Sequence, residues 1–98
     1  MKMKIRVMTD YECAPLWWDE PGRVGDIRPE DLGLSSQLVA DLWAWAGIYD
    51  ATLDRDDPRA SGFASETDEQ AFEEQGRLLS RAVASELIGW NVRYWRDA

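Results

Sequence analysis

The chain has 98 residues, the usual size of one domain, and a formal net charge of −8 from 19 acidic and 11 basic residues. Hydrophobic residues make up 45% of it and include six tryptophans, enough apolar surface for a folded core. Because this charge repels phosphate backbones and anionic lipids, we expect neither nucleic acid nor a membrane as partner. We expect a single domain over residues 1–98.

The chain has no histidine, and its only cysteine is Cys13. A disulfide within the chain and a multi-cysteine zinc site are therefore excluded. Serine and cysteine nucleophiles lack their commonest general base, and no nucleotide-binding glycine motif occurs. No run approaches the roughly 20 apolar residues of a membrane span. We predict a cytoplasmic protein with no cofactor and no catalytic residues, and the balance leans against an enzyme.

Both ends of the chain alternate between apolar and polar residues, which predicts strands over residues 3–9 and 90–96. On the outward face of this sheet we expect Lys4, Arg6, Arg93 and Trp95. A basic, aromatic face in an acidic protein should be covered, either by residues 17–20 or by another subunit.

Residues 10–34 are rich in proline and glycine and predict an irregular segment. The segment also carries many apolar side chains, among them Leu16, Trp17 and Trp18, which would be costly to leave in water. We therefore expect an ordered loop that lies over the domain.

A helix is predicted over residues 36–53, with Ser35 as its N-cap. At 100° per residue one face is apolar and should be buried. This face consists of Leu38, Leu42, Trp45, Ala46, Tyr49 and Leu53. Trp43 lies at the edge of that face, in line with Asp50 and Asp54.

A second helix is predicted from Ser65 or Thr67 to about residue 88, with Phe72, Leu79, Val83 and Leu87 buried. Gly76 lies on the same face, at a cost of about 1 kcal/mol relative to alanine, which indicates close packing by an aromatic side chain or a backbone segment. Glu86 is placed where burial and the helix dipole both disfavour a carboxylate. We expect Arg93 or Arg96 to pair with it.

These elements predict an α+β fold of the order β-(long loop)-α-α-β, a helical hairpin packed on a small antiparallel sheet. Counting the elements up and down makes the two terminal strands antiparallel. Two strands alone are marginally stable. Either the long segment adds a third strand, or two chains join their sheets in a homodimer.

Acidic residues are concentrated between the helices and at the start of the second one, where they could hold Ca²⁺ or Mg²⁺. They are Asp50, Asp54, Asp56, Asp57, Glu66, Asp68 and Glu69. The EF-hand pattern fails, because Arg59 and Ser65 occupy the positions of its glycine and its last acid. A solvated acidic turn is the simpler interpretation.

The same region could instead bind a protein. An aromatic ring beside carboxylates suits arginine and lysine side chains through cation–π and charge-assisted contacts. The predicted partner-binding residues are Trp43, Asp50, Asp54, Asp56 and Asp57. The alternative is that the long segment or the second helix covers Trp43.

Four segments together resemble a group of small, acidic, uncharacterised bacterial proteins. These are residues 14–17 (APLW), 29–35 (PEDLGLS), 45–53 (WAGIYDATL) and 56–63 (DDPRASGF), and the similarity spans residues 13–87. The Cys13-Ala14-Pro15 spacing departs from the adjacent Cys-Pro of that group. The resemblance implies no reaction, ligand or catalytic residue.

The leading functional hypothesis is a non-enzymatic acidic protein-binding module, of the immunity or antitoxin kind, that engages a basic partner. The alternative is a carboxylate-based divalent-metal-binding protein or hydrolase. A homodimer is compatible with either.

Overall fold

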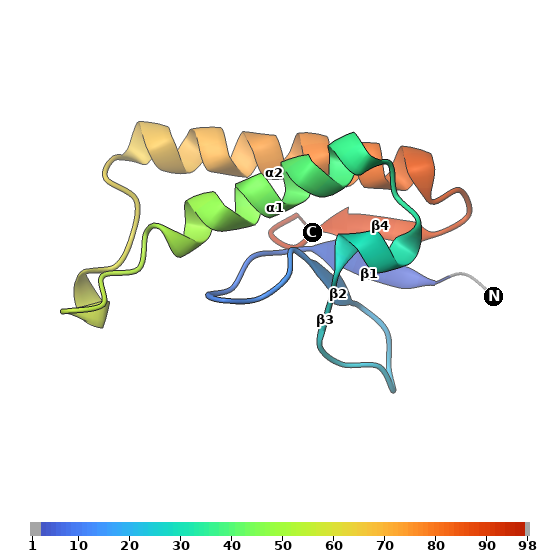
Figure 1. Cartoon of the computed structure of the whole chain (residues 1–98), viewed down its shortest axis with the longest axis horizontal. Helices are drawn as coiled ribbons and strands as arrows, with labels where there is room; N and C mark the ends of the chain where they lie inside the picture. The colour runs from blue at the N-terminus through green and yellow to red at the C-terminus, as the bar shows by residue number, and fades with distance from the viewer. Residues whose placement is uncertain (1–2, 98) are drawn as a thin grey trace.

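The computed structural model describes residues 3–97, which form two layers (Figure 1). A four-stranded sheet of order β3-β2-β1-β4 lies beneath a pair of helices. The strands are β1 Lys4–Val7, β2 Leu16–Trp18, β3 Asp26–Ile27 and β4 Asn91–Tyr94. The helices are α1 Ser36–Asp50 and α2 Glu66–Glu86, with short 3-10 helices η1 Pro29–Leu32 and η2 Pro58–Ala60. The predicted α+β class and the order strand, helix, helix, strand are confirmed.

Both helices begin at a serine cap, as their sequences indicate. The Ser35 hydroxyl accepts a hydrogen bond from the Leu38 N–H of α1, and the Ser65 hydroxyl accepts one from the Asp68 N–H of α2. A side-chain acceptor at this position satisfies one of the unpaired N–H groups of the first turn. Helix α2 also has three acids in its first turn, where the helix dipole favours them.

The long segment between β1 and α1 adds two strands to the sheet. β2 pairs with β1 in antiparallel register, with Ile5 opposite Trp18 and Val7 opposite Leu16. The two-residue strand β3 then pairs with β2. Of the two alternatives for completing the sheet, the structure has the first: strands from the same chain pair with β1.

The terminal strands are parallel, so the predicted antiparallel sheet is wrong in this respect and the sheet is mixed. Ile5 lies opposite Val92 and Val7 opposite Tyr94. Two antiparallel steps make β3 run in the same direction as β1, and α1 runs in that direction too (Figure 1). A return is therefore needed between β3 and α1, and residues 28–35 with η1 supply it. Counting elements missed this return because η1 is only one short turn.

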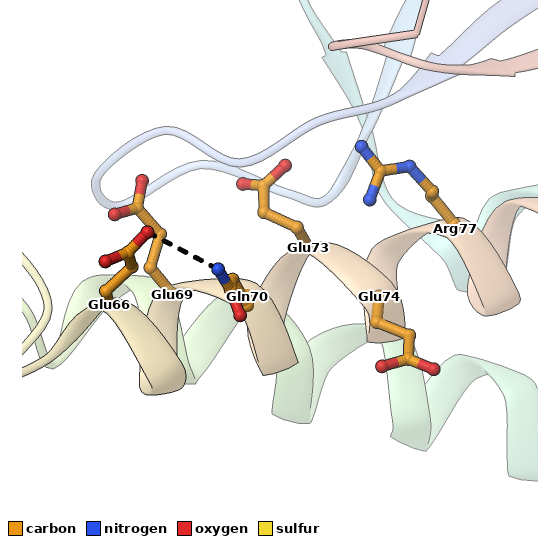
Figure 2. A pocket seen from close by; sticks show the side chains of 6 residues that line it. All are labelled: Glu66, Glu69, Gln70, Glu73, Glu74 and Arg77. Atoms are coloured by element: carbon orange, nitrogen blue, oxygen red, sulfur yellow. Dashed lines mark hydrogen bonds between the residues drawn. The ribbon is translucent and has the colours of Figure 1, made fainter.

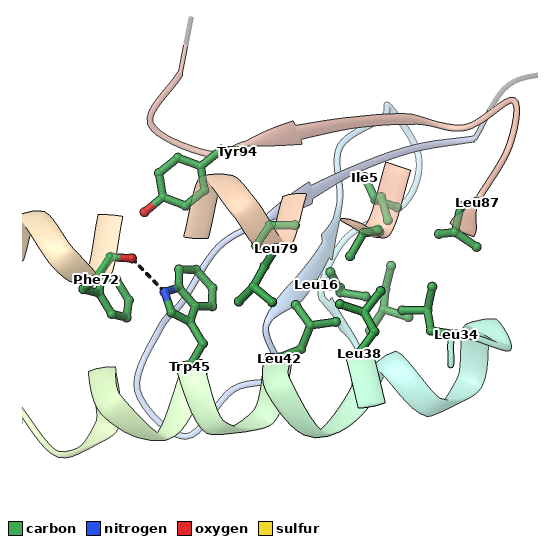
Figure 3. Packing of buried hydrophobic residues seen from close by; sticks show 13 residues of the cluster. Ile5, Leu16, Leu34, Leu38, Leu42, Trp45, Phe72, Leu79, Leu87 and Tyr94 are labelled. Carbon is green, nitrogen blue, oxygen red and sulfur yellow. Dashed lines mark hydrogen bonds between the residues drawn. The ribbon is translucent and has the colours of Figure 1, made fainter. Parts of the chain in front are cut away.

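The core is centred on Trp45 of α1, which is 1% exposed (Figure 3). Its indole N–H donates to the Phe72 carbonyl at 3.0 Å, and the Trp45 and Phe72 rings stack with centroids 4.7 Å apart. Gly76 of α2 lies against Trp45 and Tyr94, so closely that a Cβ atom there would be 2.6 Å from Trp45 Cζ2. The predicted aromatic packing at Gly76 is confirmed.

The outward face of the sheet is neutralised from within the chain. Arg6 lies opposite Arg93 on the neighbouring strand, and Asp19 follows β2. The Asp19 carboxylate accepts from Arg93 Nε at 2.6 Å and from Arg6 Nη1 at 3.3 Å. Hydrogen bonding from Arg93 holds the pKa of the Asp19 carboxyl below its usual value. The expectation that residues 17–20 cover this basic face is confirmed for Asp19.

Candidate partner-binding surface

Trp43, the predicted aromatic member of the site, is half-buried on α1. Its indole N–H donates to Glu30 Oε1 at 3.0 Å, and the Arg28 guanidinium lies 6.0 Å from its ring centroid. The bonds from the Glu30 backbone and from the Trp43 indole lower the pKa of the Glu30 carboxyl. The long segment therefore covers part of Trp43 and supplies it with both an acid and a cation.

Asp50 lies seven residues beyond Trp43, about 10 Å further along the helix axis. Its carboxylate accepts from the Glu12 backbone N–H at 2.9 Å. The Tyr11 ring stacks on Tyr49 with centroids 4.7 Å apart, and the Tyr11 hydroxyl lies 3.1 Å from that of Thr52. Asp50 thus fixes the loop at residues 10–13 against the end of α1, and the structure does not bring it together with Trp43.

Asp54, Asp56 and Asp57 lie together in the turn after α1. Asp54 Oδ1 accepts from the backbone N–H groups of Asp56 and Asp57, each at 3.0 Å. Asp54 therefore shapes the turn, which is the ordinary role of aspartate at such a position. Asp56 and Asp57 are exposed. Of the five predicted site residues, these two have carboxylates directed at solvent rather than at the backbone.

A second set of acids lies along α2 and continues the negative surface. We call Glu66, Glu69, Glu73 and Glu74 the acidic stripe. Together with Gln70 and Arg77 they line a hollow of about 580 Å³. Figure 2 shows Glu66, Glu69 and Glu73 projecting to the same side of the helix as Arg77, whereas Glu74 projects away. The sequence showed these acids as the charged start of a helix, but not that they frame a hollow.

One member of the acidic stripe, Glu73, makes contacts that stabilise the fold. Glu73 accepts from the Tyr94 hydroxyl at 2.8 Å and pairs with Arg96 at 3.1 Å. Burial of the phenol, and then its bond to Glu73, raise the pKa of Tyr94 above its ordinary value. Arg77 is likewise paired, with Asp97 at 3.0 Å. Glu66 and Glu74 have no ion pair within residues 3–97, so they contribute most to the negative potential of this face.

The expected pairing of Glu86 with Arg93 or Arg96 is wrong. Glu86 is exposed and accepts from the Ser35 backbone N–H at 2.6 Å and from the Ser35 hydroxyl at 2.7 Å. The Ser35 hydroxyl, and then the Ser35 N–H, lower the pKa of the Glu86 carboxyl. A carboxylate at the C-terminus of α2 is unfavourable for that helix, but the N-terminus of α1 attracts it.

Two other features of the sequence have a place in the structure without forming a reactive site. Cys13 is half-buried, its thiol lies 3.4 Å from the Tyr11 carbonyl, and burial raises its pKa. Within residues 3–97 no three acid or cysteine side chains converge so as to hold a metal ion. Neither α1 nor α2 has both the length and the apolar composition needed to cross a bilayer.

A comparison with protein families gives the assignment that geometry alone does not. The family model described as Serratia CdiI immunity protein-like matches residues 3–97. The chain belongs to this family. No individual curated protein matches the chain. The resemblance to bacterial proteins of unassigned function was therefore right only in part, because the family is described by an immunity role.

The family assignment supports the broad prediction, since an immunity protein fits a non-enzymatic binding module. It leaves the basic character of the partner, the five site residues and the homodimer as proposals.

Proposed function

We propose that this chain is an immunity protein that neutralises a toxin in the cytoplasm by binding it, and not by converting it chemically. The observation that carries the proposal is the family match, which spans nearly the whole chain, residues 3–97. The toxin is then the predicted protein partner. No specific observation favours the metal-dependent alternative, so it is not proposed.

The surface offered to the toxin is the acidic end of the molecule, formed by Asp56, Asp57 and the acidic stripe of α2. Asp56 and Asp57 are exposed and lie in the loop that leads into α2 (Figure 1). A surface of one charge accelerates encounter with a partner of the opposite charge, and the effect falls as salt screens it. Asp50 and Asp54 support this surface by fixing the loops around it, and Trp43 lies two helical turns away.

The first test of the function is protection. The chain is expressed together with each candidate toxin, the products of the genes that neighbour its own. A toxin whose growth arrest is relieved, and which binds the purified chain in a 1:1 complex without being altered in mass, supports the proposal. Relief without any complex would contradict it, since protection would then not arise from binding.

The second test is charge. Asp57→Asn removes an exposed carboxylate from the loop after α1, and Asp31→Asn removes one from η1, which precedes α1. If the acidic end meets the toxin, Asp57→Asn lowers the association rate constant about two- to fivefold at low salt, and Asp31→Asn leaves it unchanged. If both variants change the association rate constant equally, the acidic end is not part of the interface.

A further inference from the structure

The exposed side of α1 carries no charge over most of its length. In a chain that is 31% charged, the 15 residues of α1 include only two charged side chains, Asp41 and Asp50. The exposed positions between them are small or apolar: Ala44, Gly47 and Ile48. Ile48 is 50% exposed. Scattered apolar surface residues are ordinary, so the exposure of Ile48 needs a second feature before it indicates a contact.

The second feature is a groove that begins at Ile48. It has a volume of about 430 Å³ and runs between the C-terminal part of α1, residues 62–64 and the first half of α2. Its lining is mainly apolar, with Ile48, Phe63, Ala71 and Phe72 among the contributors. The Gly62 N–H donates to the Thr52 carbonyl at 3.0 Å, and the Phe63 ring lies 5.0 Å from that of Phe72, so the wall formed by residues 62–64 is held in place.

No residue that lines this groove, within the part of the chain described, comes from a strand. The groove therefore opens on the helical layer of the molecule. A preformed apolar recess with a fixed wall is the kind of site in which an interface buries an anchoring side chain of its partner.

The charge at the groove indicates the chemistry of its occupant. Asp68 is the only charged residue in the lining, and no cation pairs with it within residues 3–97. Glu66 and Glu69 lie in the same first turn of α2. A second copy of the chain would place two surfaces of the same sign, each on a molecule of charge −8, against one another. Charge complementarity instead favours a cationic partner.

We infer that this groove, lined by Ile48, Phe63 and Ala71 with Asp68 at its border, receives an apolar side chain of the toxin that has a lysine or arginine beside it. The inference rests on the proposed function and specifies the part of the surface that anchors the complex. The acidic end attracts the toxin, and the groove holds it. Altering the groove should therefore change mainly the dissociation rate constant of the complex. Removing a carboxylate of the acidic end should change mainly the association rate constant.

The deciding comparison is between two identical substitutions on one helix. Ala71→Arg places a long cation in the groove, and Ala84→Arg places the same side chain at an exposed position of α2 outside it. Both add one positive charge, so a difference between them reports position alone. The probe is the toxin identified by protection, with the affinity and both rate constants measured on the purified full-length chain.

We expect Ala71→Arg to raise the Kd at least tenfold, mainly through faster dissociation, and Ala84→Arg to change it less than about twofold. Ile48→Ala, which only removes side-chain atoms, should raise the Kd about tenfold and serves if Ala71→Arg does not fold. An unchanged Kd for Ile48→Ala or Ala71→Arg, or equal weakening by Ala71→Arg and Ala84→Arg, overturns the inference while leaving the immunity function intact.

The wild-type chain and Ala71→Arg also distinguish two further outcomes. If light scattering shows a dimer of the wild-type chain that Ala71→Arg dissociates, a second copy occupies the groove and the inference is wrong. If the wild-type chain binds no toxin that it protects against, the proposed function itself fails.

Discussion

Gly76 is the residue whose role the sequence indicated most directly. A glycine in the middle of a long helix is unfavourable, so its presence on the buried face of α2 indicated a close neighbour. The structure provides two, the rings of Trp45 and Tyr94. Gly47, in the middle of α1, meets nothing within 4 Å of the position a Cβ would take, apart from its chain neighbours and the backbone of its own helix. The same substitution to alanine at the two glycines therefore compares a crowded helix position with an open one.

We predict that Gly76→Ala lowers the free energy of unfolding by about 1–2 kcal/mol. The methyl group overlaps two buried rings, which costs more than the gain of about 1 kcal/mol in helix propensity. Gly47→Ala should instead raise stability by about 0.5–1 kcal/mol, because nothing opposes the propensity gain. Urea unfolding of both variants measures the difference. A Gly76→Ala variant as stable as Gly47→Ala would show that the rings do not pack as described.

Glu86 shows where prediction from the sequence at single residues ends. The sequence correctly indicated that this carboxylate needs a partner, since it lies at the unfavourable end of its own helix. Its actual partner, Ser35, is 51 positions away and caps the other helix, α1. Only the packing of α1 against α2 brings Glu86 and Ser35 together. Neither periodicity nor residue spacing in the sequence indicates which residues of two different helices come into contact.

At the level of elements, the sequence predicted those with a regular period and missed the short ones. Both long helices and both terminal strands follow from alternation or from a 3.6-residue period. Ser35 caps α1 as predicted, and α2 begins after Ser65, one of the two starts predicted for it. β2 and β3 have three and two residues, too few to show a period, and proline and glycine surround them. The parallel terminal strands were mispredicted because a third short element, η1, changes the chain direction.

The candidate site divides in the same way. Charge is visible in the sequence, so the concentration of acids at this end, including Asp56 and Asp57, could be read from it, whereas its role as a binding surface stays a prediction. The groove beside Ile48 depends on how two helices and residues 62–64 are placed relative to one another, which no local pattern encodes. The only signal available for it was the lack of charge along the exposed side of α1.

The contact between the two helix ends gives a prediction for Ser35. Its hydroxyl caps α1 and also donates to Glu86 of α2. Ser35→Ala should lower the free energy of unfolding by about 1 kcal/mol, the ordinary cost of losing a serine cap. Glu86→Gln should lower it less. Combined, the two changes should cost less than their sum, because they remove the same contact.

The neighbouring exposed serine provides the control for this prediction. Ser36→Ala lies within α1 and should be close to neutral in the same urea unfolding experiment. Fully additive losses for Ser35→Ala and Glu86→Gln would indicate that the cap and the carboxylate act independently.

For the whole molecule, Asp19 joins strands that are distant in sequence. It follows β2, and its carboxylate bonds Arg6 of β1 and Arg93 of β4, so one side chain connects three of the four strands. Helices α1 and α2 both lie over the other face of the sheet (Figure 1). On the outward face, this ion network helps to hold the strands together, as a packed layer of side chains would otherwise do.

We predict that the network makes stability depend on pH in the acid range. The pKa of Asp19 is lower in the folded than in the unfolded chain, where an aspartate titrates at about 3.9. Its contribution is therefore complete above about pH 4 and is lost as the pH falls through the lower folded value. At pH 7, Asp19→Asn should reduce the free energy of unfolding by about 1–2 kcal/mol, since the bonds are charge-assisted but partly exposed.

The measurement is urea unfolding of the wild-type chain and Asp19→Asn at a series of pH values from 7 to 2. The difference between them should be constant down to about pH 4 and then shrink towards zero, because protonation removes from the wild-type chain the charge that the variant already lacks. Arg93→Gln removes the main partner of Asp19. The difference in unfolding free energy between the wild-type chain and this variant should likewise shrink below about pH 4. A difference that persists unchanged at pH 2 would mean that Asp19 stabilises the sheet through its shape and hydrogen bonds, independently of its charge.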